Sequence, residues 1–251
     1  MTSMTNDFVS EDLVLVTGAS SGIGASVVEN LLLSGVRVAR REDKLNDIAT
    51  KSKNFFYEVF DVRCIENIAD LVKVMVTKYG KFSGFVHCAG VLNPQPLALW
   101  DYKNAIDDFK CNVFSAIEFI KALSKKKNKQ ELLSCVLISS IAASIGNAGS
   151  LTYAMTKISI NNIVVTLSQE LANQKIRINA VAPGGCVTEM AAKYQSYIMS
   201  YDYLERVRSK NLFHEDGKPS YIADLVAFLL SKKSYWIQGQ VITIDGGETL
   251  G

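Results

Sequence analysis

The sequence predicts an α/β fold, a doubly wound parallel sheet of seven strands with helices on both faces. Three observations support this prediction. Short runs rich in β-branched residues alternate with longer segments of helical periodicity. A glycine-rich turn directly follows the first of these runs and leads into a helix. Neither an internal repeat nor a proline- or serine-rich linker interrupts the pattern, so we expect one domain over residues 1–251.

The first strand is expected at Leu13–Thr17, an apolar run that is too short for a helix and is closed by glycine. The next segment, Ile23–Leu33, has apolar residues at positions 23, 27, 28, 31 and 32, which is the spacing of an amphipathic helix. Further helical patterns lie near residues 66–78, 103–124, 152–172 and 220–231. The remaining strands are expected at Val36–Ala39, Phe55–Val59, Gly84–His87, Cys135–Ser139, Ile176–Val181 and Val241–Ile244. In such a sheet, ligands bind at the carboxyl ends of the strands.

Composition and charge exclude several classes of protein. The net charge is only +2, and acids and bases are interspersed, whereas a nucleic-acid-binding protein needs a concentrated basic face. No stretch approaches the roughly 20 apolar residues of a membrane span, and the first residues lack the apolar core of a signal peptide. Five scattered cysteines and only two histidines argue against a zinc site and indicate a reducing compartment. We therefore expect a cytoplasmic protein without nucleic-acid, membrane or metal partners.

A glycine-rich turn joins the first strand to the first helix. It has the spacing Gly-x-x-x-Gly-x-Gly and reads Thr17-Gly18-Ala19-Ser20-Ser21-Gly22-Ile23-Gly24. Glycines permit the tight turn and let the backbone approach a pyrophosphate. The helix N-terminus supplies unpaired N–H groups and the positive end of a dipole. Because it lies between a first strand and a first helix, the motif favours a dinucleotide site over a simple turn.

Further motifs follow this turn in order along the chain. They are Asp61-Val62, Ala89-Gly90, Asn112, Ser140, Tyr153-x-x-x-Lys157, Arg177-x-Asn179, Pro183-Gly184 and Asp245-Gly246-Gly247. Together with the glycine spacing, they resemble the short-chain dehydrogenase/reductase family over almost the whole chain. The resemblance implies a Rossmann-type sheet and an NAD(P)-dependent oxidoreductase that acts on CH–OH or C=O groups. It also implies that the protein positions the nicotinamide and handles the proton.

Tyr153 and Lys157 are four residues apart in a predicted helix, so they share one face. A tyrosine with a pKa of about 10 is a poor acid or base at neutral pH, and an ammonium beside it stabilises the phenolate. The resemblance implies a catalytic tetrad of Asn112, Ser140, Tyr153 and Lys157. In this tetrad Ser140, rather than its neighbour Ser139, binds the substrate oxygen, and Asn112 holds a water that connects the lysine to solvent.

The end of the second predicted strand carries Arg40 and Arg41. A guanidinium suits the 2′-phosphate of NADP(H), whereas NAD-specific enzymes usually have an acidic residue there, so NADP(H) is favoured over NAD(H). Only about four residues are left for this strand, roughly 13 Å, and the register of the two arginines stays open. By resemblance, the cofactor contacts are Gly18, Ser20, Ser21, Gly22, Ile23, Gly24, Arg40, Arg41, Asp61, Val62, Cys88, Ala89, Gly90, Tyr153, Lys157, Pro183, Gly184, Val187 and Thr188.

Residues 87–90 and the segment near 188–215 also contribute to the predicted site. His87-Cys88-Ala89-Gly90 replaces the family's Asn-Asn-Ala-Gly, and we interpret His87 as a packing residue at a strand end. A substrate lid is expected near residues 188–215. Tyrosines recur at helical spacing within it, either as core packing or as pocket lining, at positions 194, 197 and 201. Such a pocket would accept an acyl chain, a ring ketone or a sugar.

Within the family, the 3-oxoacyl-[acyl-carrier-protein] reductase type is favoured because lysines at 125, 126, 127 and 129 lie roughly where such enzymes dock their acidic carrier. Gln169 departs from that type, since a second basic residue is expected there. A sugar, polyol or steroid dehydrogenase is the alternative within the family, and a non-catalytic dinucleotide-binding sensor is the alternative outside it.

The helices near 103–124 and 152–172 carry more apolar residues than one sheet face can cover, which predicts a homotetramer or homodimer. These residues are Phe114, Ile117, Phe119, Ile120, Leu123, Ile160, Ile163, Val164 and Leu167.

Overall fold

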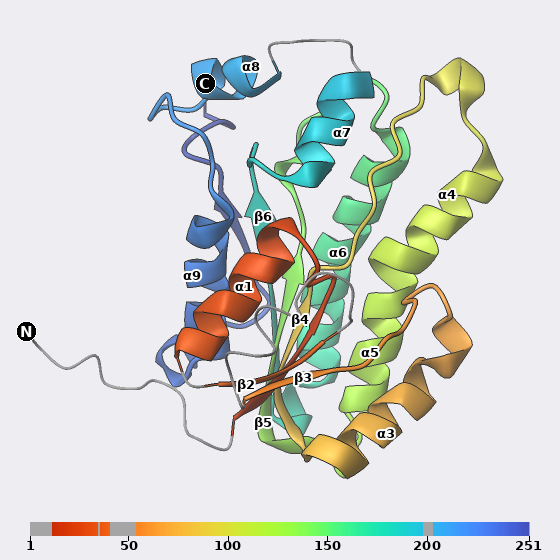
Figure 1. Cartoon of the computed structure of the whole chain (residues 1–251), viewed down its shortest axis with the longest axis vertical. Coiled ribbons are helices and arrows are strands. Elements are labelled where there is room, and N and C mark those ends of the chain that lie inside the picture. The colour runs from red at the N-terminus through yellow and green to blue at the C-terminus, as the bar shows by residue number, and fades with distance from the viewer. Residues whose placement is uncertain (1–11, 35, 41–53, 198–202, 251) are drawn as a thin grey trace, which may run out of the picture.

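Parallel pairing of neighbouring strands organises the computed structural model, which describes residues 12–34, 36–40, 54–197 and 203–250. The strands lie in the order β3-β2-β1-β4-β5-β6-β7 (Figure 1), and each neighbouring pair is parallel. The order of the strands reverses between β1 and β4. This reversal places a crevice at the carboxyl ends of these two strands. The predicted doubly wound α/β fold is confirmed.

The strands differ in length across the sheet. The central ones are β1 (Leu13–Thr17), β4 (Phe82–His87), β5 (Lys129–Ile138) and β6 (Ile176–Pro183). The outer ones are β2 (Arg37–Arg40), β3 (Phe55–Tyr57) and β7 (Val241–Ile244). β2 has four residues, as the sequence predicts, whereas β5 has ten and begins well before the expected Cys135. The extension arises because the start of β5 pairs with the start of β4 through Lys129 and Phe82.

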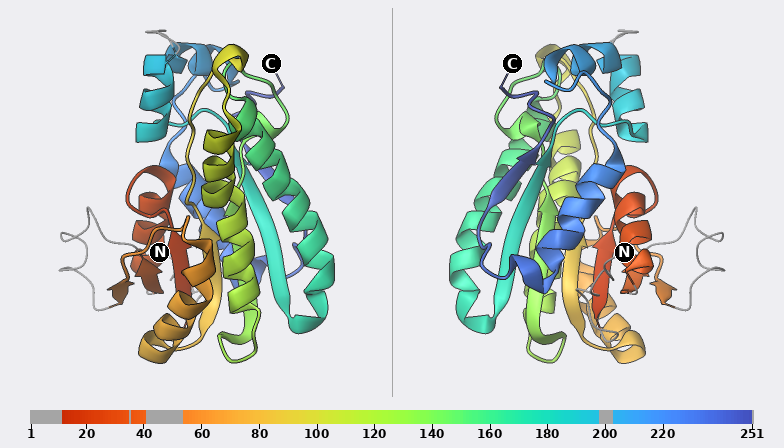
Figure 2. Two further views of the ribbon diagram at one scale, coloured as in Figure 1. Left: turned by 90° about the vertical axis from the view of Figure 1, so that its right-hand side faces the viewer. Right: turned by 90° about the vertical axis from the view of Figure 1, so that its left-hand side faces the viewer.

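Helices cover both faces of the sheet (Figure 2). One face is covered by α1 (Gly22–Leu33) and α9 (Pro219–Leu230). The other is covered by α3 (Ile68–Tyr79), α5 (Ser115–Leu123) and α6 (Leu151–Glu170), with α4 (Tyr102–Phe109) preceding α5. Two further helices, α7 (Glu189–Tyr197) and α8 (Tyr203–Lys210), lie beyond the carboxyl ends of the strands (Figure 1).

Strand β1 contributes to both hydrophobic cores because successive side chains of a strand point to opposite faces. Leu13 and Leu15 belong to the core on the side of α3, α5 and α6. Val14 and Val16 belong to the core on the side of α1 and α9. All four side chains are buried. A strand that is apolar on both faces is therefore fixed between two helical layers, and its carboxyl end is held rigidly at the crevice.

The segment that the periodicity predicts as one helix near 103–124 is divided. α4 ends at Phe109, a π-helical turn η3 (Lys110–Phe114) follows, and α5 begins at Ser115. Turns of this kind are rare and often occur at functional sites. Here the turn contains Asn112, which is fully buried.

The sequence assigns several apolar residues of α5 and α6 to a subunit interface, and this interpretation is wrong for most of them. Their side chains lie in the chain's own core, because both helices pack against the sheet and α5 also packs against α3: Phe119, Ile120, Leu123, Ile160 and Val164. Phe114, from the same predicted set, is exposed, and so are four apolar side chains of α6 that the set does not include: Leu151, Met155, Ile158 and Val165.

The turn after β1 passes against the segment that follows β4. Gly18 has a φ of +63°, and a Cβ built on it would lie 2.4 Å from the backbone nitrogen of Ala89. A Cβ on Gly24 would lie 2.3 Å from the backbone oxygen of Gly18. Contacts this short cannot be relieved by rotating a side chain, because the atoms that are met belong to the backbone. Glycine at position 18 is therefore needed for the two segments to cross, and glycine at position 24 is needed for α1 to pack against its own turn.

Gly18→Ala is expected to lower the free energy of unfolding by about 2–4 kcal/mol, because it adds a left-handed backbone penalty to a backbone clash. Urea denaturation of the purified chain measures this change. Gly146→Ala is the matched control, since a Cβ there meets nothing within 4 Å and the backbone φ is not positive. Equal stability of the two variants would contradict the proposed crossing.

Candidate active site

A cavity of about 510 Å³ lies at the carboxyl ends of the central strands. It brings together most of the predicted site residues, namely Gly18, Ser20, Ser21, Gly22, Ile23, Gly24, Asp61, Val62, Cys88, Ala89, Gly90, Ser140, Tyr153, Lys157, Pro183, Gly184 and Thr188. Two predicted residues, Asn112 and Val187, do not line it. Arg40 closes β2 opposite Tyr57, but only its backbone is described, and Arg41 lies outside the described residues.

Tyr153 and Lys157 project from the first turns of α6 into this cavity. The Lys157 Nζ atom lies 5.3 Å from the centroid of the Tyr153 ring. It also donates a hydrogen bond of 2.8 Å to the carbonyl oxygen of Ile138, the last residue of β5. Lys157 is only 5% exposed, and this burial lowers the pKa of its ammonium to about 8. The predicted pair is therefore brought together, on one helix face and against the end of a central strand.

The two neighbouring serines at the end of β5 have different surroundings. The Ser139 hydroxyl donates to the carbonyl oxygen of Lys157 (3.2 Å) and to Asn161 Oδ1 (2.6 Å), so it ties β5 to α6. The Ser140 hydroxyl accepts a hydrogen bond from the backbone N–H of Ala142 (3.1 Å) and lines the cavity. Both serines border the cavity, but only the Ser139 hydroxyl is bonded to α6, as side chains that alternate along an extended strand would be.

Asn112 holds the chain that follows β4 rather than facing the cavity. Its Oδ1 accepts from the backbone N–H of Val91 (2.8 Å), and its Nδ2 donates to the Val91 carbonyl (3.0 Å) and to Thr156 Oγ1 (3.0 Å). A Cβ built on Gly90 would meet Asn112 Oδ1 at 3.5 Å and Lys157 Nζ at 3.6 Å. The amide is thus a neighbour of the lysine across Gly90.

His87, the last residue of β4, connects β1 and α5 inside the protein. Its Nδ1 pairs with Thr17 Oγ1 at 2.9 Å and its Nε2 with Ser115 Oγ at 3.4 Å. Burial lowers the pKa of the imidazole to about 3, so the ring is neutral at physiological pH. The next residue, Cys88, lines the cavity, but burial raises the pKa of its thiol to about 12. A thiol that stays protonated is a poor nucleophile.

The walls of the cavity include residues that the sequence analysis missed. Arg63 forms an ion pair of 2.6 Å with the predicted Asp61, and Glu248 accepts from the backbone N–H of Gly185 at 2.8 Å. An apolar part of the wall consists of Ile138, Ile141, Ala142, Ile145 and Met190. A signal for part of this wall was present in the sequence, since apolar residues directly after Ser140 are unusual for an exposed loop.

The segment near 188–215, which the sequence analysis expects to be a lid, contains α7 and α8. Thr188 directly precedes α7, and its hydroxyl accepts a hydrogen bond from the backbone N–H of Ala191 in the first turn of that helix (3.2 Å). Tyr194 is buried and also lines the cavity, so core packing and pocket lining both apply to it. Tyr201 and the side chain of Tyr197 lie outside the described residues. Val187 is half-exposed, and its N–H donates to the Gly217 carbonyl.

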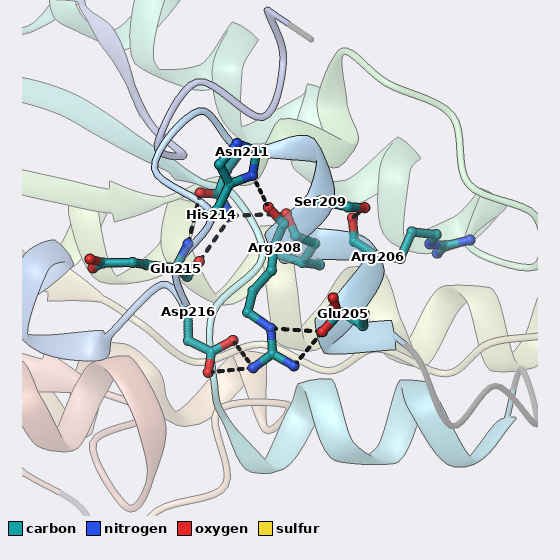
Figure 3. Close-up of polar contacts among 9 residues, drawn as sticks. Glu205, Arg206, Arg208, Ser209, Asn211, His214, Glu215 and Asp216 are labelled. Atoms are coloured by element: carbon teal, nitrogen blue, oxygen red, sulfur yellow. Dashed lines mark hydrogen bonds and ion pairs between the residues drawn. The ribbon is translucent and has the colours of Figure 1, made fainter.

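Ion pairs of Arg208 hold helix α8, and the residues that form them do not line the cavity (Figure 3). Arg208 contacts Glu205 at 2.8 Å and Asp216 at 3.2 Å. Arg206 points away from this cluster in Figure 3 and, with Lys210, lines the cavity. Residues two apart on a helix face in different directions, which explains the division between Arg206 and Arg208.

A family model described as enoyl-(acyl carrier protein) reductase matches residues 18–249. A short chain dehydrogenase family protein from Francisella tularensis superposes with a TM-score of 0.84, at 28% identity over 96% of this chain and 99% of that chain. The chain belongs to the short-chain dehydrogenase/reductase family. A 3-oxoacyl-[acyl-carrier-protein] reductase of Staphylococcus epidermidis is 28% identical over 241 residues, 93% of this chain and 97% of the relative. A substituted actinorhodin polyketide ketoreductase with NADPH superposes with a TM-score of 0.88, at 25% identity over 97% of this chain and 98% of that chain.

As a member of this family, the chain is an NAD(P)-dependent oxidoreductase. Over the ranges that the structure describes, no three or more His, Cys, Asp or Glu side chains form a group that could hold a metal ion. Nor does any helix in those ranges combine the length and the apolarity needed to cross a membrane.

The buried ammonium of Lys157 predicts a pH-dependent stability. The pKa of this group is about 8 in the folded chain and 10.5 as its ordinary value, so between these two pH values the unfolded chain binds more protons. Stability should therefore rise with pH across this window. The free energy of unfolding of the wild type, relative to Lys157→Met, should increase by up to about 1.4 kcal/mol per pH unit there. Urea titrations of both proteins at several pH values measure this difference in the free energy of unfolding. A difference that stays constant with pH would refute the buried charge.

Proposed function

We propose that this oxidoreductase uses NADP(H) to interconvert a carbonyl and an alcohol, with Tyr153 as its acid/base. The observation that carries the proposal is the Tyr153–Lys157 pair on one face of α6, which shares a cavity with Ser140 and the glycine turn. A non-catalytic dinucleotide sensor would need the turn but not this pair. We also propose that the chain is one domain, with α7 and α8 as the lid.

The residues present fit a dinucleotide. The glycine turn leads directly into α1, whose N-terminal N–H groups suit a pyrophosphate. A side chain at Gly18 or Gly24 would collide with backbone, so these positions keep the turn bare where the phosphates would bind. Ser20, Ser21, Ile23 and Thr188 would complete the contacts around it. When bound, the nicotinamide supplies or accepts the hydride.

The chain's own residues handle the proton. In the reducing direction, the Tyr153 hydroxyl donates its proton to the carbonyl oxygen, and the Lys157 ammonium stabilises the resulting phenolate. The Ser140 hydroxyl donates a hydrogen bond to the same oxygen and stabilises the charge that develops on it. Asn112, which borders Lys157 across Gly90, would hold a water that returns a proton to the lysine.

Tyr153→Phe should reduce turnover by at least about 10²-fold, because it removes the proton donor, while NADPH binding stays within about threefold. Turnover is measured as NADPH oxidation with a panel of acyl, ring-ketone and sugar carbonyls. Tyr235→Phe is the matched control, since Tyr235 is 62% exposed and does not line the cavity. Near-normal turnover in Tyr153→Phe would remove Tyr153 from the acid/base role.

The preference for NADP(H) rests on Arg40 and Arg41. Arg40 closes β2 at the same end of the sheet as the cavity, next to β1 and β3. The ketoreductase relative with NADPH supports the same preference.

Replacing both arginines with alanine should weaken NADPH binding by about tenfold or more and leave NADH binding almost unchanged, because only NADPH has the 2′-phosphate. Fluorescence titration of each cofactor measures the two affinities. Arg37→Ala, at the opposite end of β2, is the control. Equal losses for both cofactors would show that the arginines do not recognise the phosphate.

The apolar wall beside Ser140 favours a carbonyl on an apolar group, such as an acyl chain or a ring ketone, over a sugar or polyol. The 3-oxoacyl-[acyl-carrier-protein] reductase relative supports a carrier-bound acyl substrate. The lysine run does not border the cavity. Lys129 is buried and starts β5, about 30 Å of strand from the cavity edge. Any carrier would therefore reach this cavity from the side of the lid.

We propose that the chain assembles as a homodimer or homotetramer. The exposed apolar side chains along α6, at Leu151, Met155, Ile158 and Val165, support such an interface. Five free cysteines, three of them buried, support a cytoplasmic location.

A further inference from the structure

Two side chains of the α4–η3 segment hold the loop that follows β4. Asn112 binds both the N–H and the carbonyl of Val91, as described above. Asp108, four residues earlier, accepts a hydrogen bond of 2.6 Å at Oδ1 from Nδ2 of Asn93. Asp108 is 4% exposed. Asn112 and Asp108, one helical turn apart, therefore hold two alternate residues of the loop, Val91 and Asn93.

The other end of the Asn93 amide faces the lid. Its Oδ1 accepts a hydrogen bond of 3.2 Å from Nζ of Lys193, which belongs to α7. An amide between a carboxylate and an ammonium has one favourable orientation, with the NH₂ toward the anion and the oxygen toward the cation. Asn93 therefore connects a negative charge on α4 with a positive charge on α7.

The charges on this path depend on one another. The pKa of the Asp108 carboxyl is raised above its ordinary value, chiefly by burial and also by the neighbouring Asp107. The hydrogen bond from Asn93 and the charge of Lys193 oppose this rise in part. A buried carboxylate is costly to keep ionised unless hydrogen bonds and a countercharge compensate it. When α7 contacts the loop, the ammonium of Lys193 therefore helps to stabilise the ionised form of the buried Asp108 carboxyl.

The path lies beside the main cavity. It borders a second, polar cavity of about 570 Å³, and Arg63 and Val91 line both. Met190 and Tyr194 of α7 form walls of the main cavity, on either side of Lys193 in sequence. Tyr194 donates to the Ala148 carbonyl (3.2 Å), so adjacent residues of α7 are tied to the loops after β4 and β5. A shift of α7 would move two walls of the substrate site.

We propose that Asp108, Asn93 and Lys193 form a positioning relay that fixes α7 against the β4–α4 loop and so sets the shape of the substrate side of the cavity. None of the three residues takes part in the proton transfer. The consequence for substrate binding rests on the proposed carbonyl reductase function, whereas the fixing of α7 does not.

Kinetics test the consequence for substrate. With acetoacetyl N-acetylcysteamine as the carbonyl probe, Lys193→Met should raise KM about fivefold and leave kcat within about twofold, whereas Lys193→Arg should restore most of the KM. Lys73→Met on α3 is the matched control, because Lys73 is an exposed lysine that lines neither cavity. An unchanged KM in Lys193→Met, or a loss of kcat alone, would overturn the role in substrate positioning.

A double-mutant cycle tests the path through the amide. Asp108→Asn keeps the shape of the carboxyl and removes its charge. If Asn93 couples the two charges, Asp108→Asn and Lys193→Met should together change KM by about threefold less than the product of their separate effects. The same cycle in an Asn93→Ala background should be multiplicative. Multiplicative effects with Asn93 present would show that the two charges act independently.

Hydrogen exchange tests the fixing of α7 without any substrate. Lys193→Met and Asp108→Asn should each speed exchange of the α7 amides about fivefold or more, and Lys73→Met should leave it unchanged. If no carbonyl in the panel supports NADPH oxidation, the proposed function fails, and exchange alone decides the relay. If turnover is normal and α7 exchange is the same in all variants, the relay fails and the proposed function stands.

Discussion

The burial of one ammonium group at the end of β5 is the constraint on which the rest of the site depends. Lys157 Nζ is removed from water, bonded to the Ile138 carbonyl and placed beside the Tyr153 ring. A charge in this position costs the folded state free energy, so the surrounding chain must hold it firmly. Ser139 does so by tying the backbone of Lys157 to β5, and Asn112 and Gly90 close the space beside Nζ. The folded chain is thus less stable than it would be without a charged lysine at this buried position.

Much of this arrangement could be predicted from the sequence because it follows from local periodicity. The run at β1 and the glycines after it predict a strand, a turn and a helix, and the i, i+4 spacing of Tyr153 and Lys157 gives a shared helix face. Ser139 and Ser140, which are adjacent at the end of β5, have different bonding partners, as strand alternation gives. Each of these inferences concerns residues that are close in the chain, where backbone geometry alone fixes the relative directions of side chains.

The rest depends on contacts between residues that are far apart in the sequence. The π-helical turn at Asn112 is invisible to a search for helical periodicity, because the apolar pattern continues through it. Asn93 and Lys193 are 100 residues apart, and no pattern within either segment indicates the other. The apolar residues of α5 and α6 were misassigned for the same reason, since periodicity identifies an apolar face but not what covers it.

The strand order has a consequence for synthesis of the chain. β1 is made before β4, one of its two neighbours in the sheet, with Val14 opposite Gly84. Until that later segment leaves the ribosome, one edge of β1 has no partner, and this strand is apolar on both faces. An unpaired apolar edge invites association with other chains. Glu248 lines the cavity, so the complete set of lining residues is present only after this interval has ended.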